Sequence, residues 1–293
     1  MIERPTIGFI GVGKVGSTLA QVWSKAGYRI TSVYSRTQAH AITLASQVQA
    51  ISVATPKEIV QSSDLIVLTV PDDEIESVAD SLSGENWQDK AAIHTSGAHN
   101  LHSLDKLAAQ GAMTGTLHPA FPFASVATAL KQLSGATFAL EASHDVLREW
   151  LQGLVIATGG NSLLLSPENK TLYHAALVIA SNYTVTLYAA AERLLTGLGA
   201  SQTIVDQALN TLVRATVENI QHQGVPAALT GPLVRDDSGT IQGHLTALHQ
   251  IDPEIEHVYR HLARLTYPLL LARGVAVDNI EFILQKNEKS SCD

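Results

Sequence analysis

The stretch Thr6-Ile-Gly-Phe-Ile-Gly-Val-Gly-Lys-Val-Gly-Ser-Thr-Leu-Ala20 decides the fold of this chain. An apolar, strand-like run at residues 7–10 leads into a Gly-x-Gly-x-x-Gly loop, and a helical pattern follows at once. This order is typical of a dinucleotide-binding turn, because glycines allow a tight bend and a close approach of the backbone to a pyrophosphate. The N-terminus of the helix then favours the phosphates. A tight turn that binds nothing is the alternative. The cofactor contacts expected in this loop are Gly11, Val12, Gly13, Lys14, Val15 and Gly16.

Composition limits the classes of protein to which the chain can belong. It has 293 residues, 45% of them hydrophobic, and a net charge of −8. This length suggests one large or two moderate domains, and the negative charge argues against a nucleic-acid partner. Cys292 is the only cysteine, so no disulfide framework is expected. No signal peptide precedes the first strand, and polar residues interrupt the most apolar run, at residues 175–191. We therefore expect a cytoplasmic protein that does not cross a membrane.

The first half of the chain alternates strands with helices. Strand-like runs occupy residues 7–10, 29–34, 47–54, 64–70, 91–95, 112–117, 136–141 and 162–165, the last two being expected at the edge of the sheet. The alternation predicts an α/β Rossmann domain over residues 1–166, with a mostly parallel, doubly wound sheet. Ligands of such sheets bind at the carboxyl ends of the strands. Val70, Pro71, Thr95 and Ser96 are therefore expected beside the ribose and nicotinamide of the cofactor.

The end of the second strand predicts which nicotinamide cofactor binds. Sites for NAD usually place Asp or Glu there to hold the ribose 2′-hydroxyl. This chain has Ser35, Arg36 and Thr37 instead, with no carboxylate to repel a 2′-phosphate. A guanidinium suits phosphate because its donors form a planar fork. We therefore predict NADP(H) as the cofactor, with a solvated loop charge as the alternative interpretation of Arg36.

Several histidines lie near the predicted carboxyl edge. His94, His99 and His102 match no common zinc spacing, so no metal site is predicted. His118 follows the sixth strand, where a histidine can donate a proton or hold a substrate oxygen. The alternative is that His118 is a buried structural residue whose ring forms hydrogen bonds with the backbone.

The second half, residues 167–293, predicts an all-α domain. Helical patterns cover residues 168–196, 201–223, 240–249 and 253–272, and a polar tail ends the chain. On the first of them, Lys170, His174 and Ser181 fall close to one face, with Asn182 beside it. Polar groups on an apolar helix are costly unless they are paired or line a cavity. His174 and Asn182 are thus candidate catalytic residues, and helix–helix hydrogen bonds are the alternative.

The loop at residues 227–240 is a second candidate region. Arg235 and Thr230 are suited to hold a substrate carboxylate, and His244 lies one helical turn past Thr240. A capped turn with an Arg–Asp pair is the alternative. His257 and His261 lack a third ligand and are expected on a solvated helix face.

These motifs together resemble one family along nearly the whole chain. The glycine loop, His94-Thr-Ser-Gly-Ala98, Leu117-His-Pro119, Leu172-Tyr-His-Ala-Ala176 with Ala180-Ser-Asn182, and Leu229-Thr-Gly-Pro232 with Arg235 and His244-Leu245 resemble the Rossmann-like, DUF2520-containing proteins. These belong to the 6-phosphogluconate dehydrogenase-like superfamily. The first half is also similar to pyrroline-5-carboxylate reductase, F420-dependent NADP reductase and prephenate dehydrogenase.

The resemblance implies an NADP-binding domain and a helical domain that often dimerises, with the active site between them. Some relatives look like ketopantoate reductases. Related β-hydroxyacid dehydrogenases carry a catalytic Lys and an Asn one helical turn later, whereas here His174 follows Lys170 and the asparagine is Asn182. The lysine mechanism therefore does not transfer directly.

The expected activity is reduction of a small oxo or imino carboxylate by NADPH, with a small anionic substrate and a homodimer. The chemistry is assigned first to His174, with Lys170 as the second choice and with Asn182, Ser96 and His118 as further candidates. A pyrroline-5-carboxylate-type imine reductase and a non-catalytic NADPH-binding sensor or scaffold are the alternatives.

Overall fold

The computed structural model describes residues 3–285, and the chain divides into two compact units, Met1–Tyr183 and Thr184–Asp293. The sequence places the start of the helical half at residue 167, whereas the structural division falls after Tyr183. The difference arises because the helix that begins at Lys170 buries that lysine in the first unit. The predicted polar tail, with Cys292, lies outside the described residues.

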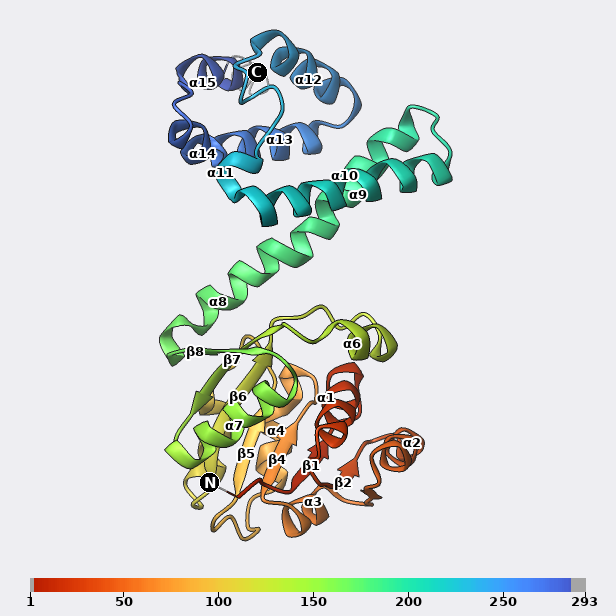
Figure 1. Cartoon of the computed structure of the whole chain (residues 1–293), viewed down its shortest axis with the longest axis vertical. Helices are drawn as coiled ribbons and strands as arrows, with labels where there is room; N and C mark the ends of the chain where they lie inside the picture. Colours follow the sequence, from red (N-terminus) through yellow and green to blue (C-terminus); the bar gives the residue numbers. More distant parts are fainter. Residues whose placement is uncertain (1–2, 286–293) are drawn as a thin grey trace. The chain divides into compact units, whose positions relative to one another are not determined.

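The first unit is built on one sheet of eight strands in the order β3-β2-β1-β4-β5-β6-β7-β8 (Figure 1). All neighbouring strands are parallel except β6 and β7, which are antiparallel. This confirms the mostly parallel, doubly wound sheet. The strands are β1 (Ile7–Ile10), β2 (Ile30–Tyr34), β3 (Ile51–Ser52), β4 (Leu65–Leu68), β5 (Ala91–His94), β6 (Met113–Pro119), β7 (Thr137–Ala142) and β8 (Asn161–Leu164).

Two apolar cores cover the two faces of this sheet. In β4, Leu65 and Val67 join the core under one set of helices, while Ile66 and Leu68 join the core on the opposite face. Trp23 is buried in the first core and Trp87 in the second. The helices of the unit are α1 (Lys14–Lys25), α2 (Gln38–Val48), α3 (Pro56–Ser62), α4 (Ile75–Ser81), α5 (Asp105–Ala108), α6 (Val126–Gln132), α7 (Asp145–Ala157) and α8 (Lys170–Leu177). Helices α1, α2 and α7 pack on one face, and α3, α4 and α5 on the other.

Two strand predictions need correction. The strand predicted at residues 47–54 is only Ile51–Ser52, because α2 continues to Val48 and Gln49 ends it in the left-handed conformation at φ 56°. The strand predicted at residues 136–141 is not an edge strand, because β7 pairs with β6 on one side and β8 on the other. The edges are β3 and β8.

The long helix predicted over residues 168–196 consists of four segments. A 3-10 turn at Pro167–Asn169 precedes α8, a π-helix occupies Val178–Asn182, and α9 (Tyr183–Gly197) follows. The π-helix contains both Ser181 and Asn182. Single π-helical turns inside helices are frequent at functional sites.

Every regular element in the described residues of the second unit, 184–285, is a helix. Besides α9 it contains α10 (Gln202–Gln223), α11 (Val225–Ala228), α12 (Ser238–Ile251), α13 (Pro253–Leu265), α14 (Tyr267–Ala272) and α15 (Asp278–Gln285). Ile241, Leu245, Leu270, Ile280 and Leu284 form its buried core. The helix predicted over residues 253–272 is interrupted at Thr266, so it becomes α13 and α14. None of the helices within residues 3–285 is both long and apolar enough to span a membrane.

Candidate functional site

The glycine loop adopts the conformation that its sequence predicts. Gly11 has φ +100°, and a Cβ there would lie 2.7 Å from the backbone carbonyl of Thr69. A Cβ on Gly16 would lie 2.6 Å from the Gly11 carbonyl oxygen, so close packing of α1 requires a glycine. At Gly13 no chain atom lies within 4 Å of an added Cβ, so this stretch of backbone is open to a ligand. The loop thus provides a tight turn, close helix packing and an exposed backbone.

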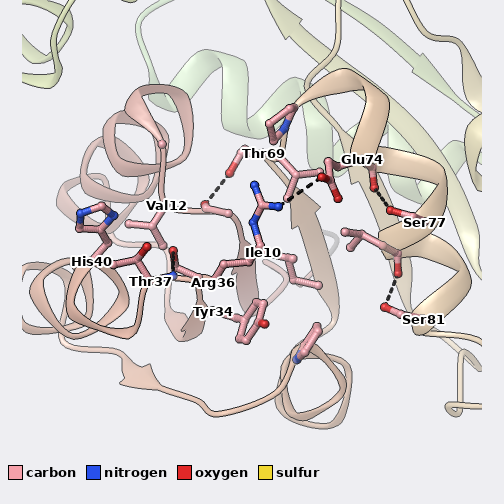
Figure 2. A pocket seen from close by; sticks show the side chains of 17 residues that line it. Ile10, Val12, Tyr34, Arg36, Thr37, His40, Thr69, Glu74, Ser77 and Ser81 are labelled. Atoms are coloured by element: carbon pink, nitrogen blue, oxygen red, sulfur yellow. Dashed lines mark hydrogen bonds and ion pairs between the residues drawn. The ribbon is translucent and has the colours of Figure 1, made fainter.

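A pocket of about 450 Å³ opens beside this loop (Figure 2). Helix α1 begins at Lys14, and Gly13 gives its N-terminus no side-chain cap. The backbone N–H groups of the first turn therefore carry partial positive charge toward this region. The pocket is lined by Ile10, Gly11, Val12, Gly13, Tyr34, Ser35, Arg36, Thr37, His40, Pro56, Thr69, Val70, Pro71, Glu74, Ser77, Val78 and Ser81.

Arg36 lies within this pocket and is paired with an acidic residue. Its Nη1 is 3.2 Å from Oε1 of Glu74, in the short turn after β4, and both side chains are exposed to solvent. His40, in the first turn of α2, lines the same pocket (Figure 2). A guanidinium, an imidazole and the hydroxyls of Ser35 and Thr37 therefore gather at the end of β2. This set of donors suits a phosphate monoester.

Some predicted cofactor residues lie elsewhere. Lys14 lines an adjoining hollow of about 340 Å³ that shares Val12, Gly13 and His40 with the pocket. Val15 packs against the core. Thr95 and Ser96, after β5, do not line the pocket around the glycine loop.

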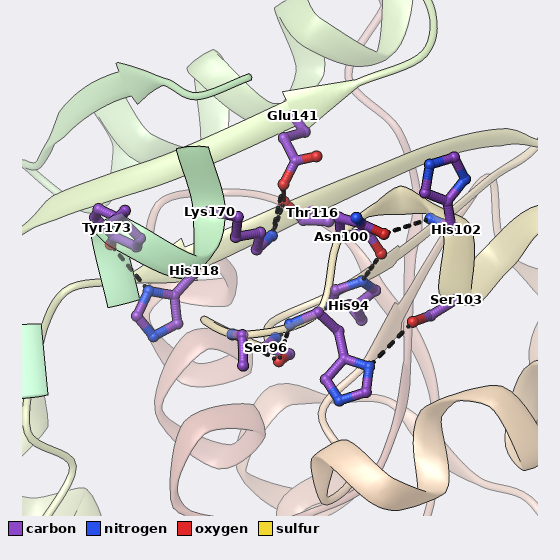
Figure 3. A network of polar contacts seen from close by, with 12 residues as sticks. His94, Ser96, Asn100, His102, Ser103, Thr116, His118, Glu141, Lys170 and Tyr173 are labelled. Atoms are coloured by element: carbon purple, nitrogen blue, oxygen red, sulfur yellow. Dashed lines mark hydrogen bonds and ion pairs between the residues drawn. The ribbon is translucent and has the colours of Figure 1, made fainter. Parts of the chain in front are cut away.

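A second polar group forms at the other end of the sheet, on β5, β6 and β7 (Figure 3). The strand register pairs His94 with Thr116 and Thr116 with Glu141, so these three residues form a row across one face of the sheet. Lys170 of α8 places its Nζ 2.7 Å from Oε1 of Glu141 and 2.7 Å from Oγ1 of Thr116. The lysine and glutamate side chains are each only 2% exposed. Lys170 therefore forms a buried ion pair with Glu141.

His118 and His174 converge next to this row. His118 lies two residues after Thr116 on β6, and His174 lies one helical turn after Lys170 on α8. Their ring centroids are 6.3 Å apart in an edge-on arrangement. A Cβ on Gly97 would lie 2.7 Å from Nε2 of His118 and 2.8 Å from Cδ2 of His174, so both rings contact this glycine. The Tyr173 hydroxyl is 2.9 Å from Nδ1 of His118.

The loop after β5 is fixed by hydrogen bonds. Ser96 donates from Oγ to Oδ2 of Asp72 at 2.7 Å, and the same oxygen accepts from the backbone N–H groups of Ala98 and His99. The backbone N–H of Ser96 donates to Nδ1 of His94, whose Nε2 lies 3.0 Å from the Asn100 carbonyl oxygen. His94 is thus a structural residue held in its neutral form, and the Ser96 hydroxyl is occupied with ordering the loop.

Burial sets the protonation of this region. Burial lowers the pKa of His94 to about 4. The hydrogen bond to Asn100 opposes this shift, and the charge of Lys170 adds to it. Burial, then Lys170 and His174, lowers the pKa of His118 to about 4. Burial raises the pKa of Tyr173 to about 12. Burial also lowers the pKa of Lys170, and the hydrogen bond and charge of Glu141 oppose that shift. At neutral pH the region therefore contains neutral imidazoles at His94 and His118 and a protonated phenol at Tyr173.

The remaining histidines of this region belong to local contacts. His99 lies 3.2 Å from the Ser103 hydroxyl, and His102 lies 3.2 Å from Asp105. Within residues 3–285, no group of three His, Cys, Asp or Glu side chains is arranged as a metal site.

The predicted substrate residues Thr230, Arg235 and His244 lie in the second unit. His244 contacts the Tyr259 hydroxyl through Nδ1 at 3.1 Å. Hydrogen bonds from Thr240, with smaller help from the charges of Arg235 and His244, lower the pKa of Asp237. Arg235 itself is exposed and forms no ion pair among the described side chains. The Arg–Asp pair considered from the sequence is thus a longer-range attraction and not a direct contact.

Several residues of these two groups were not singled out from the sequence. His40 is four positions after Arg36, a spacing that places it at the start of the next helix. Tyr173 directly precedes His174, so its position beside His118 was accessible in principle. No sequence pattern pointed to Glu141, because its contacts depend on the antiparallel direction of β7 and on the pairing of Glu141 with Thr116.

Comparison with known proteins identifies the two parts of the chain. A Rossmann-like domain matches residues 2–119, and the domain of unknown function DUF2520 matches residues 136–266. No curated protein matches the chain. The chain therefore contains a Rossmann-like domain followed by a DUF2520 domain.

Solved structures share this fold at low identity. A Bacteroides fragilis protein described as an NADP oxidoreductase is 24% identical, with a TM-score of 0.71 over 90% of this chain and 98% of its own. The Plasmodium falciparum pyrroline carboxylate reductase with NADP bound is 14% identical, with a TM-score of 0.62 over 99% of both chains. The Aspergillus terreus reductive aminase in complex with NADPH and ethyl-5-oxohexanoate is 16% identical, with a TM-score of 0.63 over 91% of this chain and 94% of its own.

Proposed function

We propose that this protein is an NADP(H)-dependent oxidoreductase that reduces the ketone or imine of a small carboxylate. The observation that carries the proposal is the combination of two groups in one unit. One is an open glycine loop with Arg36 beside it, and the other is His118 and His174 around Gly97, with Tyr173 against His118. The first group fits a dinucleotide, and the second supplies donors for a substrate oxygen or nitrogen. Structural neighbours that bind NADP or NADPH support the same cofactor.

The residues of the pocket fit an NADP cofactor. Gly13 leaves the backbone open for a pyrophosphate, and the first turn of α1 offers its N–H groups. Arg36, with Ser35, Thr37 and His40, supplies donors for a 2′-phosphate. When bound, the nicotinamide supplies the hydride for the reduction.

The histidine group has the chemistry to assist that reduction. Carbonyl reduction develops negative charge on oxygen, and donors aimed at this oxygen stabilise the transition state. His118 is neutral, and a Tyr173 hydroxyl that donates to Nδ1 leaves the proton of His118 on Nε2, the atom beside Gly97. We assign His118 to hydrogen bonding of the substrate and His174 to proton transfer. The roles of Asn182 and Ser96 in catalysis stay predictions, and Ser96 already donates to Asp72.

We also propose that Arg235 and Thr230 recognise the anionic group of the substrate, with His244 nearby. The support is the exposed guanidinium of Arg235, which no described carboxylate pairs with directly. Replacement of Arg235 by Gln is expected to act on KM more than on kcat.

A homodimer through the helical half is part of the proposal. Helix α9 has no buried residue, and α10 buries Val205 and Leu209 alone. Leu212 is 63% exposed and Val185 is 69% exposed. Helices gain their stability from burying an apolar face, so these two need a covering surface. A second copy of the chain provides one with matching apolar character.

The test is NADPH oxidation by the purified protein against 2-oxo acids and cyclic imines, ketopantoate and pyrroline-5-carboxylate included. For a compound that turns over, His174→Ala should lower kcat by about 10²–10⁴-fold, as the loss of a general acid does, and leave the Kd for NADPH within about threefold. His102→Ala, at an exposed histidine of the same unit, is the matched control and should change neither value.

Three other results would change the conclusion. Undiminished turnover in His174→Ala removes the proton-transfer role of this residue. Tight NADPH binding without turnover of any compound favours a sensor or scaffold. A protein that binds neither NADPH nor NADH contradicts the proposal as a whole.

A further inference from the structure

Lys170 is the most deeply buried cation near the proposed reaction site, and the proposed mechanism does not use it. It begins α8, and its ammonium group lies against the sheet, away from solvent. Buried lysines are rare unless they are paired, because removing the charge from water is unfavourable. The role of this charge therefore needs an explanation.

The contacts of Lys170 form a closed triangle. Its Nζ donates to Glu141 Oε1 and to Thr116 Oγ1, each at 2.7 Å, and Thr116 Oγ1 donates to the same Glu141 oxygen at 3.1 Å (Figure 3). The other carboxylate oxygen of Glu141 is buried and has no hydrogen-bond partner among residues 3–285. The carboxylate thus depends on Lys170 and Thr116, and the ammonium group is held in one place.

Strand and helix geometry connects this triangle to His118. Thr116 and His118 are two residues apart on β6, so their side chains lie on the same face of the sheet. Lys170, Tyr173 and His174 lie three and four residues apart on α8 and share a helix face. Figure 3 shows that this helix face lies over that strand face. The ammonium group and the imidazole are therefore neighbours on one surface.

The other charged and titratable groups around His118 are few. Asp72 lies in the turn after β4 and favours the charged form of the imidazole, whereas His94 on β5 and His174 on α8 disfavour it. Tyr173 contacts Nδ1 and keeps its proton, since burial raises its pKa to about 12. Glu141 on β7 is already paired with Lys170. After burial itself, Lys170 is the largest influence that holds the pKa of His118 low.

We propose that Lys170, fixed by Glu141 and Thr116, is a positioning residue that keeps His118 neutral, so that its Nε2–H donates a hydrogen bond to the substrate. This inference rests on the proposed function for its catalytic meaning. A neutral imidazole can polarise a carbonyl as a hydrogen-bond donor, and its unprotonated Nδ1 can at the same time accept from the Tyr173 hydroxyl. Lys170 acts through His118 and does not touch the substrate.

The test is a titration of His118 in the full-length protein, observed by nuclear magnetic resonance with ¹⁵N-labelled histidine. The signal is assigned from its loss in His118→Gln. In the wild type His118 should stay neutral down to about pH 5, because its pKa lies at about 4. In Lys170→Met the repulsion from the ammonium group disappears while the burial of His118 remains, so the titration should move to higher pH than in the wild type.

Matched variants separate charge from packing. Lys170→Arg keeps the charge and should titrate like the wild type. Thr116→Val removes the hydroxyl that contacts both partners without changing any charge, so the His118 titration should stay within a few tenths of a pH unit. If Lys170→Met does not fold, Lys170→Met combined with Glu141→Gln removes both charges and keeps the volume, and the titration should still move up.

An unchanged titration in the folded methionine variants overturns the inference, and so does an equal shift in Thr116→Val, which would indicate a packing effect. The titration needs no substrate, so it is independent of whether reductase activity is found. Once a substrate is known, the acid limb of the kcat profile should move in the same direction in Lys170→Met.

Discussion

At the scale of single residues, Arg36 has two competing anionic partners. Its pair with Glu74 is exposed on both sides, and such pairs contribute about 0–1 kcal/mol. A phosphate dianion that accepts two charge-assisted hydrogen bonds contributes more, about 1.5–3 kcal/mol for each bond to a charged group. The 2′-phosphate of NADP(H) should therefore displace Glu74 from Arg36.

This comparison predicts the effect of Arg36→Glu on cofactor choice. The substitution should weaken NADPH binding by about 10–100-fold, because it replaces a favourable contact with repulsion. NADH binding should change by less than about threefold, since NADH lacks the 2′-phosphate. Fluorescence titration with both cofactors measures the two dissociation constants. Arg29→Glu, an exposed site at the opposite end of β2, is the charge-matched control. Equal losses for both cofactors would contradict the assignment of Arg36.

The sequence predicted the positions of single residues where a short motif determines them, and not where they depend on contacts between distant segments. Gly11 and Gly16 could be assigned because their positions in a short motif fix both the turn and the helix that follows it. The proximity of His118 and His174 was not predictable from spacing, because it depends on how α8 lies over β6. For the same reason Lys170 was a candidate acid from sequence, while the structure places it in a buried ion pair with Glu141.

At the scale of elements, the reversed strand β7 determines what lies behind the proposed reaction site. Because β7 runs antiparallel to β6, Glu141 comes into register with Thr116 and, through it, with His94 on β5. Alternating apolar runs predicted the strands well, but apolarity alone does not give the direction of a strand. The sequence therefore predicted β7 as a strand without predicting this row.

The buried histidines of β5 and β6 predict a pH dependence of stability. The pKa values of His94 and His118 are lowered to about 4 in the folded protein, against about 6.5 in an unfolded chain. Above pH 6.5 both are neutral in both states. Between pH 6.5 and 4 the unfolded state binds more protons, so the free energy of unfolding falls as the pH falls. The upper limit is about 1.4 kcal/mol per pH unit for each histidine, and the partly exposed His118 should contribute less.

Urea denaturation at pH 7, 6 and 5 measures this slope. His94→Gln and His118→Gln should each make it shallower, while His102→Gln, at an exposed site, should leave it unchanged. A slope that none of the three substitutions alters would mean that these histidines do not set the acid sensitivity of the fold.

At the scale of the whole molecule, the two units differ in how well they bury their apolar residues. The first unit has two extensive cores, whereas α9 and α10 of the second leave large apolar side chains in solvent. The sequence predicted both helices from their periodicity. It did not predict their exposure, since an apolar stripe has the same pattern whether it packs within its own chain or against another.

The proposed dimer predicts the effect of charges on α10. Leu212→Glu combined with Ile220→Glu should convert the dimer into monomers, because carboxylates are costly to bury in an apolar interface. Light scattering coupled to size-exclusion chromatography measures the mass. Gln207→Glu, at an exposed position on the polar face of α10 that also carries Arg214 and Glu218, should leave the dimer intact. A wild-type protein that is monomeric at micromolar concentration would rule the dimer out.

The distribution of tryptophan has a practical consequence for spectroscopy. All three tryptophans, Trp23, Trp87 and Trp150, belong to the first unit, and Trp23 and Trp87 are buried on opposite faces of its sheet. Tryptophan emission therefore arises from the unit Met1–Tyr183 alone. A reduced nicotinamide absorbs light in the range where tryptophan emits, so energy transfer to a bound ligand would be visible without any added label.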